Sequence, residues 1–266
     1  MCEIFCFNSN TPKQVNKCLE CFYNHSEQHP HGWGLATMQS DEFVITKEPI
    51  KASCSQNLKS ILSHPVVGKN VFAHIRLATV GEIISPNCHP FIEADDNNRS
   101  WMLIHNGTIF DYPKLDCYKD KENGDTDSER ILLYIIDRVN AFEKDKGAPS
   151  TIKERFNLLF EIIADLSKNN KVNLMIHDGD LTYIHSNMKD SLYYLKNDEG
   201  FLIASTPLDD DENWMAVELN KLFGLIDGNI IFESEEHPNE FIFTEFHEKA
   251  IEEFLKTVNP EDANDN

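Results

Sequence analysis

Basic residues are scarce in this chain of 266 residues, which holds 24 lysines and arginines against 45 aspartates and glutamates and carries a formal net charge of −21 at pH 7. A chain this acidic repels the phosphates of nucleic acid and of anionic membranes, and no run of lysine or arginine offsets the repulsion. We therefore expect neither nucleic acid nor a membrane among its partners. The acidic excess is typical of a hydrated surface that keeps a protein in solution.

Long apolar runs are missing as well. No window approaches the roughly 18 apolar residues of a membrane-spanning helix. The opening segment MCEIFCF has no basic residue and polar residues follow it, which does not fit a secretory signal peptide. A cytoplasmic location is therefore expected, with the thiols kept reduced. The seven cysteines are odd in number and lack the spacing of a disulfide framework, so most are predicted to be small buried hydrophobic residues.

Apolar side chains are still numerous enough to build a core. Hydrophobic residues make up 41% of the chain and aromatic residues 10%, which excludes global disorder. Single domains often reach roughly 250 residues, and no linker or shift in composition divides this chain. We predict one domain over residues 1–258, followed by a flexible acidic tail over 259–266.

The order of the predicted elements indicates the fold class. A helix over 12–24 and several strands come first, then two long helices, then more strands. The first long helix begins after Thr126, which with Glu129 has the spacing of a capping box. This segregation favours antiparallel sheets covered by helices over a parallel, doubly wound sheet. Strands are predicted at 2–7, 34–38, 43–47, 71–77, 101–105, 171–177, 181–186, 191–196, 200–205, 222–226 and 229–233.

Cys2 combines two reactive groups if the initiating methionine is removed, as is usual before a small residue. Its thiol would then share a residue with a free α-amine, whose pKa near 7.7–8.0 suits it to accept the thiol proton near neutral pH. An N-terminal nucleophile of this kind carries its own base and needs no histidine partner. A Met-Cys start alone is a weak signal.

Further motifs follow in a fixed order, and each is loose by itself. Together with Met1-Cys2 they resemble the class-II glutamine amidotransferases, and in particular their stand-alone YafJ-type subfamily. The likeness extends through segments near 173–179 and 203–214. The motifs are HGWGLA at 31–36, AHIRLATVG at 73–81, NCHPF at 87–91, HNG at 105–107 and GDTDSE at 124–129.

The resemblance implies a fold and a reaction. The fold is a four-layer αββα sandwich of two antiparallel sheets, the N-terminal-nucleophile hydrolase fold. The reaction is hydrolysis of the side-chain amide of glutamine, in which Cys2 forms a γ-glutamyl thioester and ammonia leaves. Asn106 and Gly107 would supply the N–H donors of the oxyanion hole. An Asn-Gly pair taken alone is more typical of a plain turn, and only the accompanying motifs favour the oxyanion role.

Other motif residues are expected to hold the substrate. The guanidinium of Arg76 matches the α-carboxylate of glutamine, although a structural ion pair is the alternative. Asp127 in the first turn of a helix would pair with the α-ammonium, a role compatible with stabilising the helix dipole. Thr79, Gly81 and His89 join the pocket by resemblance. Structural roles remain open for His89, and likewise for His31, Trp33 and His74.

No metal and no cofactor is expected. Cys18, Cys21, His25 and His29 have a compact spacing reminiscent of zinc ligands. If the predicted helix continued to residue 29, however, positions 18 and 29 would lie about 16 Å apart, too far for one tetrahedral ion.

Three functions remain open at this level. The chain is a glutaminase that passes ammonia to a separate partner protein, a γ-glutamyl peptide hydrolase for substrates such as glutathione that works with a peptidase partner, or a catalytically inactive binding subunit. The intact set of Cys2, Arg76, Asn106, Gly107 and Asp127 argues against the inactive subunit.

Overall fold

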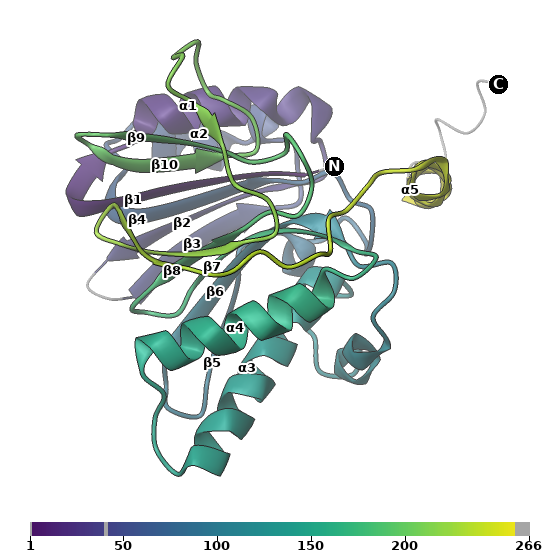
Figure 1. Cartoon of the computed structure of the whole chain (residues 1–266). Helices are drawn as coiled ribbons and strands as arrows, with labels where there is room; N and C mark the ends of the chain where they lie inside the picture. Colours follow the sequence, from purple (N-terminus) through teal and green to yellow (C-terminus); the bar gives the residue numbers. More distant parts are fainter. Residues whose placement is uncertain (1, 40–41, 259–266) are drawn as a thin grey trace.

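Two antiparallel sheets lie face to face, and helices cover the outer face of each. The computed structural model describes residues 2–39 and 42–258 (Figure 1). Helices α1 (Asn16–Asn24) and α2 (Gln56–Leu62) pack on one sheet, and α3 (Asp127–Lys146) and α4 (Ile152–Leu166) on the other. The predicted four-layer αββα sandwich is confirmed. The predicted tail over 259–266 lies outside the described residues.

The first sheet has seven strands, with β1 (Glu3–Gln14) near its middle. Its order is β11 (Met215–Ala216), β9 (Tyr193–Asn197), β10 (Gly200–Ala204), β1, β4 (Val67–Ile75), β2 (Trp33–Gln39) and β3 (Glu42–Glu48). Antiparallel pairing sets Glu3 opposite Ile75 and Phe5 opposite Ala204. The start of β1 therefore lies between the ends of β4 and β10.

The second sheet has six strands and contributes the opposite wall. Its order is β13 (Asn229–Glu233), β12 (Leu222–Ile226), β8 (Thr182–His185), β7 (Lys171–His177), β6 (Ser100–Thr108) and β5 (Phe91–Ala94). In its centre the end of β6 pairs with the start of β7, so that Gly107 is opposite Val172 and Thr108 opposite Lys171. A last helix, α5 (Glu245–Val258), lies apart from the four layers (Figure 1).

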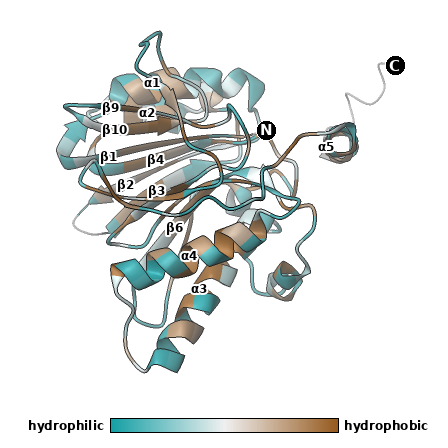
Figure 2. Cartoon of the chain, in the orientation of Figure 1, coloured by the Kyte–Doolittle hydropathy of each residue, from teal (hydrophilic) through white to brown (hydrophobic). Residues whose placement is uncertain are grey.

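Three apolar layers hold the sandwich together. Ile4, Phe72 and Met175 are fully buried between the sheets. Leu19 and Phe22 pack from α1 onto the first sheet, and a larger cluster under α3 and α4 lines the second. Figure 2 shows both hydrophobic and hydrophilic residues along α3 and α4. This amphipathic pattern is the helical periodicity expected of a helix that covers a sheet.

Two local predictions need correction. The helix predicted over 12–24 begins at Asn16, because residues up to Gln14 continue β1. The pairing with β4 shifts register between Asn8 and Lys13, and such a bulge tolerates Pro12, which has no N–H to donate.

The cap of α3 is also different from the predicted reciprocal box. The Thr126 hydroxyl accepts from the Glu129 N–H at 3.3 Å, as expected. The Glu129 carboxylate, however, accepts from the backbone N–H groups of Asn123 at 2.8 Å and Gly124 at 2.9 Å. Glu129 therefore holds the preceding loop in place.

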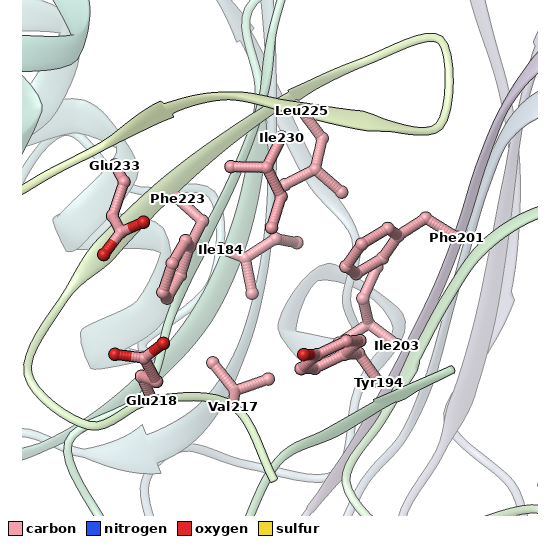
Figure 3. A pocket seen from close by; sticks show the side chains of 10 residues that line it. All are labelled: Ile184, Tyr194, Phe201, Ile203, Val217, Glu218, Phe223, Leu225, Ile230 and Glu233. Atoms are coloured by element: carbon pink, nitrogen blue, oxygen red, sulfur yellow. The ribbon is translucent and has the colours of Figure 1, made fainter. Parts of the chain in front are cut away.

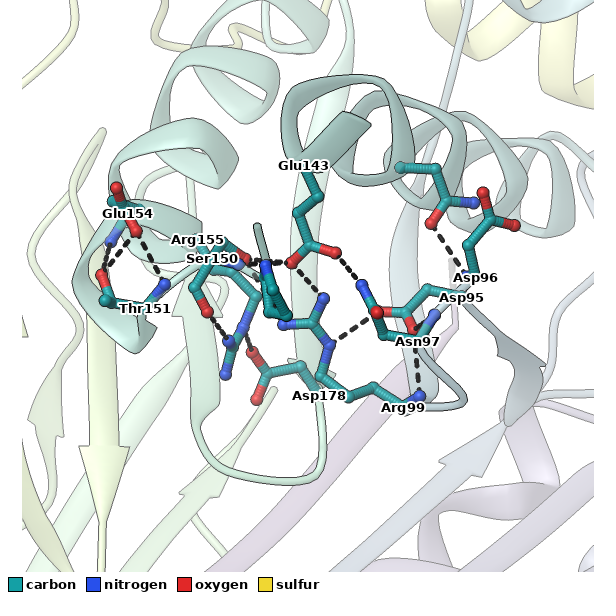
Figure 4. A network of polar contacts seen from close by, with 12 residues as sticks. Asp95, Asp96, Asn97, Arg99, Glu143, Ser150, Thr151, Glu154, Arg155 and Asp178 are labelled. Carbon is teal, nitrogen blue, oxygen red and sulfur yellow. Dashed lines mark hydrogen bonds and ion pairs between the residues drawn. The ribbon is translucent and has the colours of Figure 1, made fainter. Parts of the chain in front are cut away.

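A buried polar network links α3 and α4 to the second sheet (Figure 4). Arg155 on α4 donates from Nε to the Asp178 carboxylate at 2.6 Å, and both side chains are almost fully buried. At the other end of the network Arg99 pairs with Asp95 at 2.7 Å and also with Glu143. Glu143 accepts from the Ser150 N–H at 2.8 Å. The network thus fixes the turn between the two helices.

Glu143 is expected to make stability depend on acid pH. Burial alone would raise its pKa, but the hydrogen bonds from Ser150 and Arg99 outweigh burial and lower the pKa to about 2. A carboxylate whose folded pKa is depressed stabilises the fold above its unfolded pKa near 4.5, and this contribution is lost as the pH falls toward 2. In urea unfolding between pH 7 and 2.5, the free energy of unfolding should fall less steeply with decreasing pH for Glu143→Gln than for the wild type. Glu161→Gln, at an exposed position on α4, is the control; equal slopes in all three proteins would contradict the prediction.

Candidate active site

The register of the first sheet brings Cys2 to Arg76. Because Glu3 pairs with Ile75, Cys2 lies beside the residues that follow β4, and its Sγ donates to the Leu77 carbonyl at 3.4 Å. Burial raises the pKa of the Cys2 thiol, while the charges of Arg76 and Lys171 act in the opposite direction. The thiol is therefore protonated near neutral pH and needs a base to become a nucleophile. Met1, whose removal was predicted, lies outside the described residues.

Asn106 projects from the end of β6 and is fixed from both sides. Its Nδ2 donates to the Ser205 hydroxyl at 3.1 Å, and its Oδ1 accepts from Lys171 Nζ at 3.0 Å. The same Ser205 hydroxyl accepts from the Ile4 N–H at 3.0 Å. One hydroxyl therefore joins β1, the strand that directly follows Cys2, to the side chain of Asn106 on the opposite sheet.

Gly107 occupies a position that no larger residue fits. A Cβ there would lie 2.0 Å from the Lys171 carbonyl oxygen and 2.2 Å from His105 Nε2. Its neighbours belong to β6 and β7, so the clash could not be relieved without moving the sheet. Asn106 and Gly107 form part of a strand rather than the plain turn that an Asn-Gly pair also allows.

Lys171 and Ser205 were not singled out from the sequence. Lys171 begins a predicted strand, where a lysine normally marks a solvated end. Ser205 ends a strand within a motif segment, and a serine there is unremarkable. Pairing of β7 with β6 brings Lys171 to Asn106, and packing of the first sheet on the second brings Ser205 to it.

Arg76 is buried beneath the loop that follows β4. Its guanidinium donates to the carbonyls of Val80 at 2.9 Å, Gly81 at 3.2 Å and Glu82 at 2.8 Å. These bonds account for at most three of its five N–H groups. Arg76 therefore shapes the loop, and its binding to the substrate carboxylate stays a prediction.

Hydrogen bonds of Asn87 connect the same loop to the N-terminus of α3. Asn87 Nδ2 donates to the Glu82 carbonyl at 2.9 Å, and its Oδ1 accepts from the Asp125 N–H at 2.9 Å. Gly81 has a φ of +78°, and a Cβ there would lie 2.7 Å from Asp125 Oδ1. Glycine is favoured at Gly81 for both reasons.

Asp127 and Thr79 lie where the loops meet β6. Asp127 is buried in the first turn of α3, as predicted, and its carboxylate accepts from the Ile109 N–H at 2.8 Å. The Thr79 hydroxyl is 2.9 Å from that of Thr108. Both residues hold the segment after Gly107, and their contact with a substrate stays a prediction.

The histidine-rich motifs have structural contacts. His31 Nδ1 accepts from the Ala78 N–H at 2.9 Å, and Trp33 Nε1 donates to Glu48 at 3.1 Å. The His74 and His89 rings stack with their centroids 4.0 Å apart, and burial holds the pKa of each well below its usual range. Both rings are therefore neutral at physiological pH. Substrate binding by His89 stays a prediction.

Two features lie outside this cluster. An apolar hollow of about 90 Å³ opens between the sheets, with Tyr194 and Phe201 on one side and Ile184 and Phe223 on the other (Figure 3). Its lining includes none of the predicted site residues. A second hollow is lined by Leu255 of α5 together with His31 and Leu77. Helix α5 therefore lies close to the residues that follow β4.

Neither a candidate metal site nor a candidate membrane span lies within residues 2–39 and 42–258. There, no group of three or more histidine, cysteine, aspartate or glutamate side chains is arranged to hold a metal ion. His25 of the zinc-like spacing pairs instead with Glu3, at 2.8 Å. Across the same residues, each helix is too short or too polar to cross a membrane.

Comparison with known proteins gives this geometry a family. Residues 1–197 match the family model of the class-II glutamine amidotransferases. The putative glutamine amidotransferase YafJ of Escherichia coli is 25% identical over 219 residues, which cover 79% of this chain and 82% of that protein. The γ-glutamyl-hercynylcysteine sulfoxide hydrolase of Mycolicibacterium smegmatis is 27% identical over 208 residues, covering 78% and 82%.

A solved structure shares the fold. The glutamine phosphoribosylpyrophosphate amidotransferase of B. subtilis superposes with a TM-score of 0.63 at 17% identity, over 90% of this chain and 50% of that one. The family match covers most of the chain and agrees with the fold. The chain belongs to the class-II glutamine amidotransferases.

Proposed function

We propose that the protein is a cysteine-dependent amidohydrolase that cleaves the γ-amide of glutamine through a γ-glutamyl thioester on Cys2. The observation that carries the proposal is the Ser205 bridge, which ties the strand of Cys2 at 3.0 Å and the amide of Asn106 at 3.1 Å to one hydroxyl. The bridge supports the proposal because it holds the strand that follows Cys2 next to Asn106, and acyl transfer requires a nucleophile and an oxyanion donor at one place.

The reaction has two stages in this proposal. After removal of Met1, the α-amine of Cys2 takes the thiol proton, and Sγ attacks the δ-carbonyl carbon of the substrate. The Asn106 side-chain N–H and the Gly107 backbone N–H stabilise the oxyanion. The C–N bond then breaks, and ammonia leaves with the proton. Water attacks the thioester in the second stage and releases glutamate and the free thiol.

The substrate would be held at its α-carbon end. Arg76 would pair with the α-carboxylate through the N–H groups that its loop carbonyls do not use. Asp127 would pair with the α-ammonium, and Thr79, Gly81 and His89 would complete the pocket. No cofactor enters either stage.

A γ-glutamyl peptide is the second candidate substrate. It shares the glutamyl end with glutamine and differs only in the leaving group. The relative from M. smegmatis favours this candidate, because its name describes a hydrolase of a γ-glutamyl compound. It aligns with 78% of this chain. An ammonia-accepting protein would be the partner in the first case and a peptidase in the second.

A release assay tests the proposal and separates the candidates. The purified protein is incubated with glutamine, glutathione and other γ-glutamyl compounds, and glutamate is measured together with ammonia or the released amine. We expect turnover of at least one compound and a protein mass that begins at Cys2. Preference for glutamine supports the glutaminase, and preference for a peptide supports the hydrolase. No turnover of any compound would indicate an inactive binding subunit.

A further inference from the structure

Lys171 is a buried cation for which the steps above have no use. Its side chain is 1% exposed, at the first residue of β7. Lysine is almost never fully buried unless it is paired. Its Nζ lies 3.0 Å from Asn106 Oδ1. The register that sets Thr108 opposite Lys171 places the cation beneath the end of β6.

This contact determines which way the Asn106 amide faces. An ammonium group only donates hydrogen bonds, so the atom that faces it must be the amide oxygen. The amide NH₂ then points away from Lys171, and it donates to Ser205 at 3.1 Å. In the flipped amide, two donor groups would face each other in a buried place, which is unfavourable because neither would have an acceptor. Lys171 thus presents the NH₂ group on the side where an oxyanion donor is needed.

The cation also interacts with Cys2. Burial lowers the pKa of Lys171 to about 8, and the nearby Cys2 thiol acts in the opposite direction. Lys171 in turn counteracts the burial that raises the pKa of Cys2. Burial has the larger effect on the pKa of both groups. The structure links the two sites, because the Ser205 hydroxyl that accepts from Asn106 also accepts from the Ile4 N–H, two residues after Cys2.

We propose that Lys171 is a positioning residue of the amidohydrolase site, which fixes the Asn106 amide for the oxyanion and favours the thiolate of Cys2 through its charge. The proposal rests on the function proposed above, because Asn106 is taken as the oxyanion donor. It adds Lys171, the first residue of β7, to the residues proposed above for the reaction.

The rate of Cys2 alkylation tests how the charge of Lys171 affects the thiol, and it needs no substrate. Iodoacetamide modification of the N-terminal peptide is followed by mass spectrometry across pH 6–10 in the wild type, Lys171→Met and Lys171→Gln. Removing the cation should raise the apparent pKa of Cys2 alkylation in both variants. The control is Lys168→Met, since Lys168 is exposed and pairs with Asp165 at the surface. Coinciding profiles would overturn the role of the charge.

Kinetics with the best γ-glutamyl substrate test the positioning. Lys171→Met should lower kcat by about 10²–10³-fold, the usual effect of losing one oxyanion donor, with little change in KM. Lys171→Gln keeps an amide donor for Asn106 and should lose less. Equal kcat for all variants would overturn the positioning role, as would a rise in KM alone.

Two further measurements distinguish failure of the Lys171 proposal from misfolding and from failure of the proposed function. They are the urea midpoint of each variant and the activity of the wild type. If Lys171→Met does not fold, as judged by its urea midpoint, Lys171→Gln and Lys171→Arg carry the test, and Lys171→Arg should retain the wild-type alkylation profile. If the wild type hydrolyses no γ-glutamyl compound, the proposed function fails. A shifted alkylation profile would still support the coupling of Lys171 to Cys2, and an unshifted one would overturn it.

Discussion

Replacement of Cys2 by alanine is expected to lower the rate of γ-glutamyl hydrolysis by on the order of 10⁴-fold or more, to the level of the assay background. The variant lacks the atom that forms the thioester in the proposed reaction, at the start of the strand that the Ser205 bridge ties to Asn106. Glutamate release under saturating substrate is the measurement. The fold should persist, because Cys2 is only partly buried and precedes β1.

The matched control is Cys54→Ala, which removes an exposed thiol far along the chain and should keep full activity. Covalent labelling gives an independent check. The glutamine analogue 6-diazo-5-oxo-norleucine should add its mass to Cys2 in the wild type. Activity of Cys2→Ala within tenfold of the wild type, or labelling at another cysteine, would remove Cys2 from the mechanism.

Loss of the Arg155 side chain is expected to cost about 3–5 kcal/mol of unfolding free energy, the usual effect of breaking a buried ion pair. In Arg155→Met the Asp178 carboxylate stays buried and loses its cation at 2.6 Å. The Tyr183 hydroxyl at 2.7 Å and the Leu181 N–H at 2.8 Å still donate to Asp178, but they do not neutralise its charge. Urea unfolding at pH 7 gives the free energy.

An exposed arginine on the neighbouring helix provides the comparison. Arg138→Met makes the same chemical change on the outer face of α3 and should stay within about 0.5 kcal/mol of the wild type. In Arg155→Met with Asp178→Asn, the stranded charge is gone, so part of the loss should be recovered. A loss below 1 kcal/mol in the single variant would mean that the network of Figure 4 contributes little to stability.

Much of the fold was predictable because its signals are local. Strands with apolar runs, such as 171–177 and 222–226, lie where they were predicted. The helix after Thr126 begins at Asp127, since the cap acts within one turn. The helix predicted from Pro12 was placed too early, because pairing with β4 keeps residues up to Gln14 in the sheet.

The site could be predicted only in part. Cys2, Asn106 and Gly107 stand out through motifs, which are local strings of residues. Lys171 and Ser205 have no such signal, because an isolated lysine or serine at a strand end is common and usually solvated. Their contacts with Asn106 span 65 and 99 positions of the chain. The contact of Lys171 exists only once β7 pairs with β6, and that of Ser205 only once the two sheets are packed.

The sequence by itself determined the antiparallel class through the order of its elements. Its motifs determined the resemblance to the family, and that resemblance implied the two-sheet sandwich and supported the candidate nucleophile. Periodicity, caps and motifs are all carried by neighbouring residues. The tertiary structure alone decided which side chains surround that nucleophile. Burial lowers the pKa of Lys171 and of the histidine pair, and burial depends on the opposite sheet. The direction in which the Asn106 amide points depends on a cation 3.0 Å away on another strand. Both are long-range properties, and they arise only when strands distant in the chain are brought together.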